Sequence, residues 1–194
     1  MTLKVGIAGG IGSGKTTVCN VIEALGYPVY YADAEAKKIS ETDRLVISAI
    51  SNLFGADIYI SGRLDRKRLA SLVFNSKVLL SKLNAIVHPA VAEHFEMWVS
   101  KTNSPIVFKE AAILFESGLY KMLDRNILVI APEDVRLKRV VDRDNTGVDD
   151  VKKRMLNQSP QNELIKLADY IINNDGIELI MPQLLSIIDN LKKL

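Results

Sequence analysis

The chain has 194 residues, 48% of them hydrophobic, which is enough to bury one sizeable core. Its 25 basic and 23 acidic residues leave a formal net charge of +2, too nearly balanced to indicate a nucleic-acid or membrane partner. The single cysteine, Cys19, excludes an internal disulfide framework. Because neither a signal-like leader nor an apolar run of membrane-spanning length is seen, we expect a cytoplasmic protein.

Short apolar runs recur along the chain and predict buried strands. Continuous apolarity over a few residues is typical of strands that are covered on both faces, as in a parallel sheet. Between the runs, apolar residues recur at three- and four-residue steps, which predicts helices and therefore an α/β fold with a parallel sheet. The five runs are LKVGIA (3–8), PVYYA (28–32), PIVF (105–108), NILVIA (126–131) and DYIIN (169–173).

The first predicted strand is followed by GGIGSGKTT, residues 9–17. A dinucleotide fingerprint, G-x-G-x-x-G, fails here because Thr17 stands at its third glycine position. The rival pattern G-x-x-x-x-G-K-[ST] is complete, since Gly9, Gly14, Lys15 and Thr16 occupy its fixed positions. The sequence therefore favours a P-loop over a purely structural glycine turn.

The residue types of this loop suit a nucleoside triphosphate. Glycines at 10, 12 and 14 would let backbone N–H groups point inward as an anion cradle, at the positive end of a helix that begins near Lys15. Lys15 would reach the outer phosphates, and the Thr16 hydroxyl would bind Mg²⁺. We therefore expect ATP and Mg²⁺ at a site formed by Gly10, Ile11, Gly12, Ser13, Gly14, Lys15, Thr16 and Thr17.

A P-loop does not by itself predict the reaction. A GTPase switch would need an N-K-x-D motif, which the sequence lacks, and a motor ATPase would need a strand ending in Asp-Glu, where IVFKE ends in Lys109-Glu110. A small-molecule kinase needs a carboxylate beside the acceptor hydroxyl, at the carboxyl end of a strand. PVYYAD ends in Asp33, which fits this role, although Asp33 could instead cap the next helix.

Two intervals interrupt the alternation of strands and helices. Residues 40–103 have helical patterns almost throughout and offer no convincing buried strand. Residues 134–168 are also helical but more basic, and Arg136, Arg139 and Arg143 share one helix face. Such a row of arginines is commonly solvated surface, but beside a P-loop it favours a lid that closes over the transferring phosphate.

Taken together, the chain resembles the dephospho-CoA kinase family, which transfers the γ-phosphate of ATP to the ribose 3′-hydroxyl of dephospho-CoA. The resemblance is carried, in order along the chain, by GGIGSGKTT, YADAEA, RLDRKRLASLVF, LNAIVHPAV, ILFESGLY, LKRVVDRD, RMLNQ and ADYIINNDG. It implies that Asp33 is the catalytic base, that Lys15 and Thr16 contact the phosphates and Mg²⁺, and that Arg139 and Arg143 are catalytic lid arginines.

The resemblance also implies a division of the chain. A P-loop NTPase-type core with a parallel five-stranded sheet would comprise residues 1–39, 105–133 and 169–194, with a helical acceptor domain at 40–104 and a lid at 134–168. His88 and Arg66 would lie near dephospho-CoA, and Asn174 would lie near adenine. His88-Pro89 could instead mark a helix start, and Asn174 a turn; another small-metabolite or nucleoside monophosphate kinase, or a regulatory P-loop NTPase, stays open as an alternative.

Overall fold

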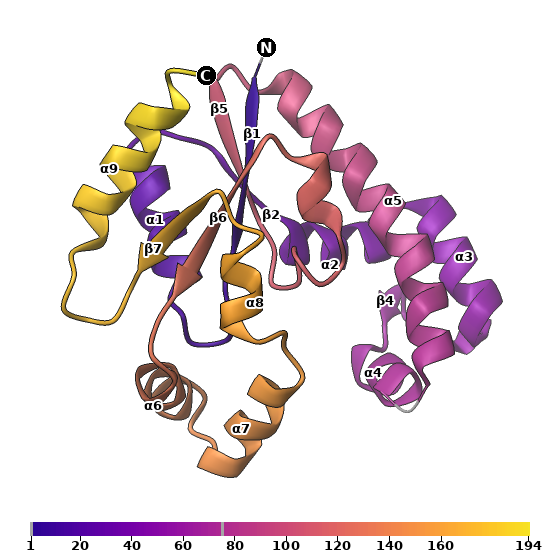
Figure 1. Ribbon diagram of the computed structural model, residues 1–194. Coiled ribbons are helices and arrows are strands. Elements are labelled where there is room, and N and C mark those ends of the chain that lie inside the picture. The colour runs from indigo at the N-terminus through magenta and orange to yellow at the C-terminus, as the bar shows by residue number, and fades with distance from the viewer. Residues whose placement is uncertain (1, 75) are drawn as a thin grey trace. The chain divides into compact units, whose positions relative to one another are not determined.

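The computed structural model describes residues 2–74 and 76–194. The chain forms two compact units (Figure 1), a sheet unit made of Met1–Tyr31 and Thr102–Leu194 and a helical unit made of Ala32–Lys101. The helical unit begins at Ala32, earlier than the expected boundary at residue 40, because the helix that follows the second strand packs against other helices of this unit. The expected lid, residues 134–168, is not separated from the sheet unit.

The sheet unit contains the predicted parallel sheet of five strands, in the order β2-β5-β1-β6-β7. All neighbouring strands run parallel, and the central strand β1 pairs with β5 on one side and β6 on the other. The strands are β1 (Leu3–Ala8), β2 (Val29–Tyr31), β5 (Ile106–Glu110), β6 (Arg125–Ile130) and β7 (Tyr170–Asn173). Each overlaps one predicted apolar run, because each run supplies side chains to both faces of the sheet, although β5 continues to Glu110, beyond the run at 105–108.

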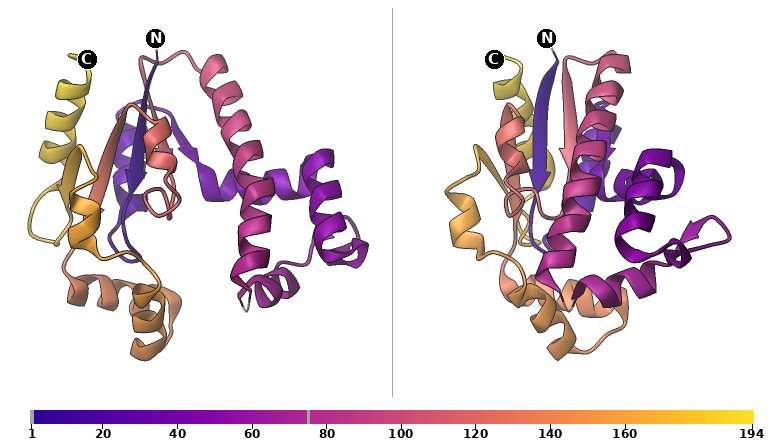
Figure 2. Two further views of the ribbon diagram at one scale, coloured as in Figure 1. Left: turned by 45° about the vertical axis from the view of Figure 1, so that its right-hand side comes forward. Right: turned by 90° about the vertical axis from the view of Figure 1, so that its right-hand side faces the viewer.

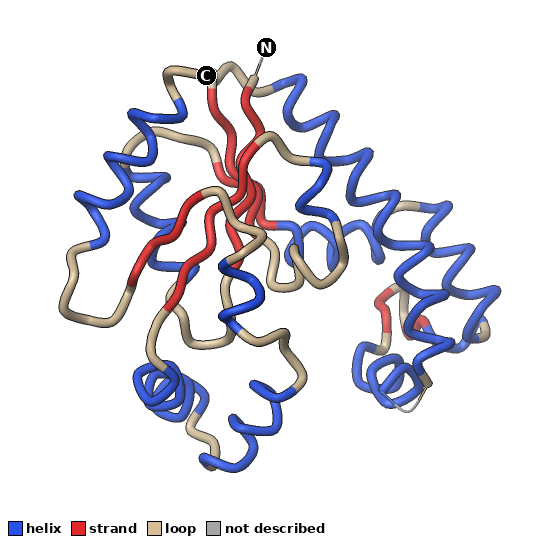
Figure 3. The backbone as a smooth tube through the Cα atoms, viewed as in Figure 1, coloured by secondary structure: helices blue, strands red, loops and turns tan. Residues whose placement is uncertain are grey.

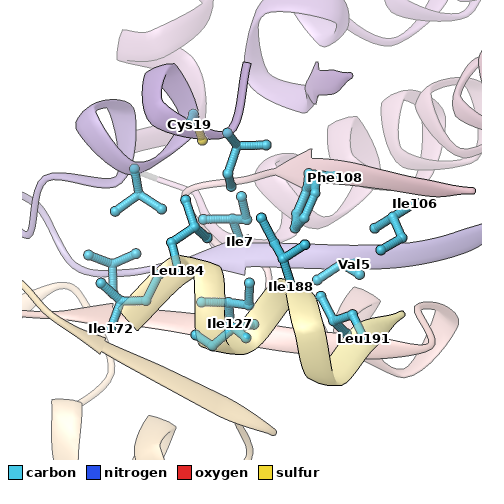
Figure 4. Packing of buried hydrophobic residues seen from close by; sticks show 14 residues of the cluster. Val5, Ile7, Cys19, Ile106, Phe108, Ile127, Ile172, Leu184, Ile188 and Leu191 are labelled. Carbon is cyan, nitrogen blue, oxygen red and sulfur yellow. The ribbon is translucent and has the colours of Figure 1, made fainter. Parts of the chain in front are cut away.

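The hydrophobic core lies between one face of the sheet and helices α1 (Lys15–Ala24) and α9 (Ile180–Leu191), as Figure 4 shows. The sheet contributes Val5, Ile7 and Phe108 among others, and the helices contribute Ile22 and Leu184; all five are completely buried. The opposite face is covered by residues 111–124, with the 3₁₀ helix η2 (Leu119–Met122), and by α8 (Gln161–Ile165). Both faces of the central strands β1, β5 and β6 are thus largely covered, which leaves their ends to form a site.

Two further helices of the sheet unit, α6 (Glu133–Asp144) and α7 (Val148–Leu156), follow β6. They lie at the carboxyl ends of the strands, the end at which β1 runs into α1 (Figure 2). The prediction that residues 134–168 are helical is therefore confirmed, with α6, α7 and α8 covering most of the interval. This placement brings Arg136 of helix α6 beside the glycine-rich loop.

The helical unit contains α2 (Ala32–Thr42), α3 (Arg44–Phe54), η1 (Ala56–Ile58), α4 (Arg66–Phe74) and α5 (Lys77–Lys101). Helix α5 contacts α2, α3 and α4. The unit is not wholly helical, since a short antiparallel hairpin, β3 (Tyr59–Ile60) with β4 (Arg63–Leu64), interrupts it (Figure 3). The hairpin turns at Ser61 and Gly62, whose φ angles of 50° and 78° suit a tight two-residue turn.

Helix α5 is 25 residues long and contains Pro89 in its interior. The alternative prediction that His88-Pro89 marks a helix start is therefore wrong, because the helix begins at Lys77. Proline is tolerated there although it cannot donate the backbone hydrogen bond of a helix interior. In the described part of the chain, no helix combines the length and the apolarity that a membrane span requires.

Candidate nucleotide-binding site

The loop between β1 and α1 has the backbone conformation of an anion cradle. Gly12 and Gly14 have positive φ angles of 77° and 89°, which residues with a side chain rarely adopt. Gly14 directly precedes α1, and the N–H of Ser13 donates to the carbonyl of Gly10 at 3.0 Å, closing a turn. The loop therefore ends at the positive terminus of α1, where anions bind favourably.

Packing adds a second reason for glycine in this loop. A Cβ atom at Gly10 would lie 2.5 Å from Nη2 of Arg136, and one at Gly14 would lie 2.0 Å from Nδ2 of Asn174. We expected Gly10, Gly12 and Gly14 all to be needed for the turn, but Gly10 has no positive φ. What Gly10 provides is room for the Arg136 side chain.

Asn174 braces the P-loop from the loop after β7. Its side chain is buried, and its Nδ2 donates to the carbonyl of Ser13 at 2.8 Å. Its own carbonyl oxygen accepts a hydrogen bond of 2.9 Å from Nη1 of Arg139. The expected alternative, a turn role, belongs to the next residue: the Asp175 carboxylate accepts hydrogen bonds from two backbone N–H groups that follow it, and these lower its pKa.

Lys15 lies in the first turn of α1 and is largely buried. Its Nζ donates to the carbonyl of Gly9 at 2.8 Å and is 3.9 Å from Oε1 of Glu110, the last residue of β5. Both side chains are 14% exposed. The ammonium group is thus held beside the cradle by oxygen atoms on the sheet side of the loop.

Arg136 is a site residue that the sequence analysis placed on the correct helix face but did not assign to nucleotide binding. Its Nε donates to the carbonyl of Ile11 at 2.9 Å, while Oε1 of Gln158 accepts the N–H of Ile11 at 2.8 Å. Burial lowers the pKa of Arg136. Two residues from the predicted lid therefore hold both backbone polar groups of one P-loop residue, Ile11, and the spacing of Arg136 with Arg139 and Arg143 was the sequence signal for this contact.

These elements enclose a cavity of about 500 Å³. Its cationic lining comes from Lys15, Arg139, Arg143 and Arg154, and no carboxylate lines it among the residues that the structure describes. The loop residues Gly10, Ile11, Gly12, Gly14, Thr16 and Thr17 complete the predicted part of the lining. The size and the positive charge suit a nucleotide with several phosphate groups.

The buried hydroxyl of Ser13 adds an observation that fits a phosphate ligand. This side chain is 1% exposed, and its Oγ has no hydrogen-bond partner among the described residues. A buried hydroxyl without a partner is unfavourable, and this one belongs to the loop that forms the anion cradle.

The other predicted residues belong to the helical unit. Asp33 is exposed and is the second residue of α2, so it lies within the first helical turn and does not cap the helix as the alternative proposed; β2 ends two residues earlier, at Tyr31. Arg66 donates from Nη2 to Oε1 of Glu41 and to the carbonyl of Lys37, both at 2.8 Å. His88 lies in the interior of α5 and is half-buried.

Comparison with known proteins agrees with this site. The family model described as dephospho-CoA kinase matches residues 3–178. A dephospho-CoA kinase of Bacteroides fragilis is 39% identical over 189 residues, which cover 97% of this chain and 92% of that protein. A solved structure of a Thermus thermophilus protein has 35% identity and a TM-score of 0.88, and one of a dephospho-CoA kinase from Campylobacter jejuni has 28% identity and a TM-score of 0.71; each match covers 100% of this chain and 98% of the other. The chain therefore belongs to the dephospho-CoA kinase family.

Proposed function

We propose that this chain transfers the γ-phosphate of ATP to the ribose 3′-hydroxyl of dephospho-CoA, giving CoA and ADP. The observation that carries the proposal is the cationic cavity of about 500 Å³ in which the P-loop meets Arg139, Arg143 and Arg154. Its charge and volume suit a triphosphate, and the family membership of the chain supplies the acceptor.

The P-loop and α1 would bind the phosphates. Backbone N–H groups beside Gly12 and Gly14 and the N-terminus of α1 stabilise negative charge without having to reorganise. Lys15 would exchange its contact with the Gly9 carbonyl for phosphate oxygens. Arg139 and Arg143 would offset the charge that develops during transfer, because both line the same cavity.

The residues present also fit a magnesium ion. Mg²⁺ prefers oxygen ligands and is held in such sites by few protein groups together with substrate phosphates. Thr16 lines the cavity, and we infer that its hydroxyl would bind the ion directly. Glu110, whose Oε1 lies 3.9 Å from Nζ of Lys15, would supply a further oxygen through a water molecule. When bound, Mg²⁺ would neutralise part of the phosphate charge.

Asp33 is the proposed catalytic base. It is exposed, and its carboxylate follows the carboxyl end of β2 by two residues. In phosphoryl transfer through a loose transition state, such a carboxylate orients the acceptor hydroxyl and accepts its proton as negative charge builds on the attacking oxygen. The phosphate passes directly to the acceptor, so no residue of the protein has to form a covalent intermediate with it.

We assign the acceptor dephospho-CoA to the helical unit, with Arg66 and His88 among its contacts, and adenine of ATP to the neighbourhood of Asn174. Arg66 supports this assignment because it is partly exposed and pairs with Glu41 through one nitrogen, Nη2, which leaves Nη1 and Nε as further donors. Residues 134–168 would act as the lid. The single buried cysteine fits a cytoplasmic location.

An acceptor screen tests the proposal. Purified protein with ATP and Mg²⁺ would be offered dephospho-CoA, nucleoside monophosphates, nucleosides and shikimate, and ADP formation and product mass would be measured. We expect ADP only with dephospho-CoA, together with one phosphate added at the 3′-position. Transfer to a different acceptor would overturn the assignment to dephospho-CoA, and ADP release without any acceptor would favour a regulatory NTPase.

A further inference from the structure

Asp144, the last residue of α6, joins two arginines from different helices. Its Oδ1 accepts a hydrogen bond of 2.7 Å from Nε of Arg143, and its Oδ2 accepts one of 3.2 Å from Nη2 of the same residue. Oδ2 also accepts a hydrogen bond of 2.7 Å from Nη1 of Arg154, on α7. One carboxylate therefore holds Arg143 of its own helix through both oxygens and Arg154 of α7 through Oδ2.

Both arginines line the cavity that contains the P-loop, whereas Asp144 does not. Each guanidinium keeps donors that Asp144 does not use, namely Nη1 of Arg143 and the Nε and Nη2 groups of Arg154. A guanidinium can bind a carboxylate along one edge and a phosphate oxygen along another. The arrangement thus leaves donors on both guanidinium groups available to an anion in the cavity.

The charges explain why a carboxylate is needed at this position. Two guanidinium groups that approach one anion repel each other, and a shared negative charge offsets the repulsion. The hydrogen bonds from Arg143 and Arg154 hold the pKa of Asp144 well below its usual range, so that the carboxylate is ionised throughout the pH range of kinase assays. Exposed ion pairs contribute little to overall stability, so the contribution we infer is to geometry.

Helix α6 is itself fixed to the P-loop, so a residue that is bonded to α6 is also positioned relative to the P-loop. Arg136 binds the carbonyl of Ile11, and Arg139 binds the carbonyl of Asn174, the residue that braces Ser13. Asp144 lies at the far end of the same helix. Asp144 therefore links Arg154 to this fixed helix, in addition to the hydrogen bond by which Gln158, four residues after Arg154, accepts the N–H of Ile11.

We propose that Arg154 is a further phosphate-binding residue, directed at the terminal phosphate of the nucleotide, and that Asp144 is a positioning residue that holds Arg143 and Arg154 at the cavity. The proposal rests on the proposed function, because it takes ATP as the phosphoryl donor. It assigns Asp144 no contact with the substrate.

The test compares Asp144→Asn, Arg154→Ala and the double variant with the wild-type chain. We expect Arg154→Ala to lower kcat about 10²-fold, the scale seen when one charge-stabilising donor is lost, and Asp144→Asn to lower it about tenfold. Because Asp144 acts in part through Arg154, the double variant should lose less than the product of the two single losses. Full multiplicative loss, or an unchanged kcat in Asp144→Asn, would overturn the positioning role.

Asp150→Asn is a matched control. Asp150 lies on α7, its carboxylate is exposed and 3.8 Å from Lys153, and it does not line the cavity. Its kcat should stay within about twofold of wild type, the scale of a surface substitution. An equal loss of kcat in Asp150→Asn and Asp144→Asn would show a general effect of charge on helices α6 and α7 and would also overturn the proposal.

A binding measurement separates this proposal from the proposed function. Affinities for ATP and AMP, measured without acceptor, should show weaker ATP binding but unchanged AMP binding in Arg154→Ala, since only ATP carries the terminal phosphate. If the wild-type chain failed to phosphorylate dephospho-CoA, this ratio would still decide the role of Arg154. Should Asp144→Asn melt early, Arg154→Lys, which keeps the charge but loses the fork, must still show a reduced ATP-to-AMP preference, and a wild-type ratio would refute the assignment.

Discussion

The side-chain amide of Asn174 donates a hydrogen bond of 2.8 Å to the carbonyl oxygen of Ser13 across 161 residues of sequence. The same nitrogen occupies the space that a Cβ atom at Gly14 would need. The loop after β7 thus supports the P-loop through Asn174, and the conformation of the anion cradle depends on both loops.

Replacing Asn174 by Ala should weaken this support. The Ser13 carbonyl would lose a buried hydrogen-bond partner, which costs about 1–3 kcal/mol of unfolding free energy, and the cradle would become less ordered. We expect a lower midpoint of urea unfolding together with a raised KM for ATP. Asn190→Ala, at an exposed position on α9, is the control; equal stability of the two variants would show that the Asn174 contact contributes nothing.

Gly14→Ala should be more damaging than a positive φ alone explains. A comparison with Gly26→Ala isolates the difference, because Gly26 has a similar φ of 86° but no atom of the described residues within 4 Å of the added Cβ, whereas Gly14 would place its Cβ 2.0 Å from Asn174. Gly26→Ala should cost about 1–2 kcal/mol of unfolding free energy. Gly14→Ala should cost more and should also abolish measurable ATP binding; equal losses of stability would refute the packing argument.

Lys15→Ala should reduce both nucleotide affinity and turnover. Lys15 lines the cavity, and its ammonium group donates to the P-loop carbonyl of Gly9; a preorganised charge at a transferring phosphate contributes about 10²-fold or more to the rate. Calorimetric ATP binding and steady-state kinetics would measure the two effects. Normal turnover in this variant would contradict the P-loop assignment.

Asp33→Asn should separate catalysis from nucleotide binding. Loss of a general base lowers the rate about 10²- to 10⁴-fold, while ATP affinity should stay nearly unchanged because the proposed role of Asp33 is toward the acceptor hydroxyl and not toward the nucleotide. Glu35, which also lies in the first turn of α2, offers the control variant Glu35→Gln. A large loss of ATP affinity in Asp33→Asn would instead indicate that this residue binds metal or nucleotide.

The sheet and the P-loop could be predicted because their signals are local. Each strand is a continuous apolar run, and the glycine-rich motif has fixed spacing. The β3–β4 hairpin could not be predicted in the same way, since its strands have two residues each and too few positions to show an alternation. The start of the helical unit at Ala32 could not be predicted either, because it depends on contacts between α2 and α5.

The contacts within the site were harder to predict than its motif. Arg136 and Ile11 are 125 residues apart, and nothing in the sequence shows that a guanidinium group fills the space beside Gly10. Asp144 stands in a run rich in charges of both signs, where an acidic residue ordinarily indicates a solvated helix end. Its role as the partner of Arg143 and Arg154 becomes visible only when α6 and α7 are placed side by side by the fold.

Because of Cys19, the free energy of unfolding should fall as the pH rises through the alkaline range. Its side chain is completely buried, and burial together with the nearby Glu110 carboxylate raises the pKa of the thiol to about 12. In the unfolded chain the thiol ionises near its ordinary pKa of about 8.5. The contribution of the protonated thiol to stability is therefore complete below about pH 8.5 and is lost as the pH rises toward the folded-state pKa.

Urea unfolding of wild type and Cys19→Ala between pH 8 and 10.5 measures this contribution, because other titrating groups are shared by the two chains. The wild type should be more stable at pH 8, since Cys19→Ala leaves a small cavity in the core beside α1. Above about pH 8.5 the difference in unfolding free energy should shrink by up to about 1.4 kcal/mol per pH unit. If the difference in unfolding free energy stayed constant over this range, the thiol would have the same pKa in the folded and unfolded chain. Burial would then not raise the pKa of Cys19, contrary to the prediction.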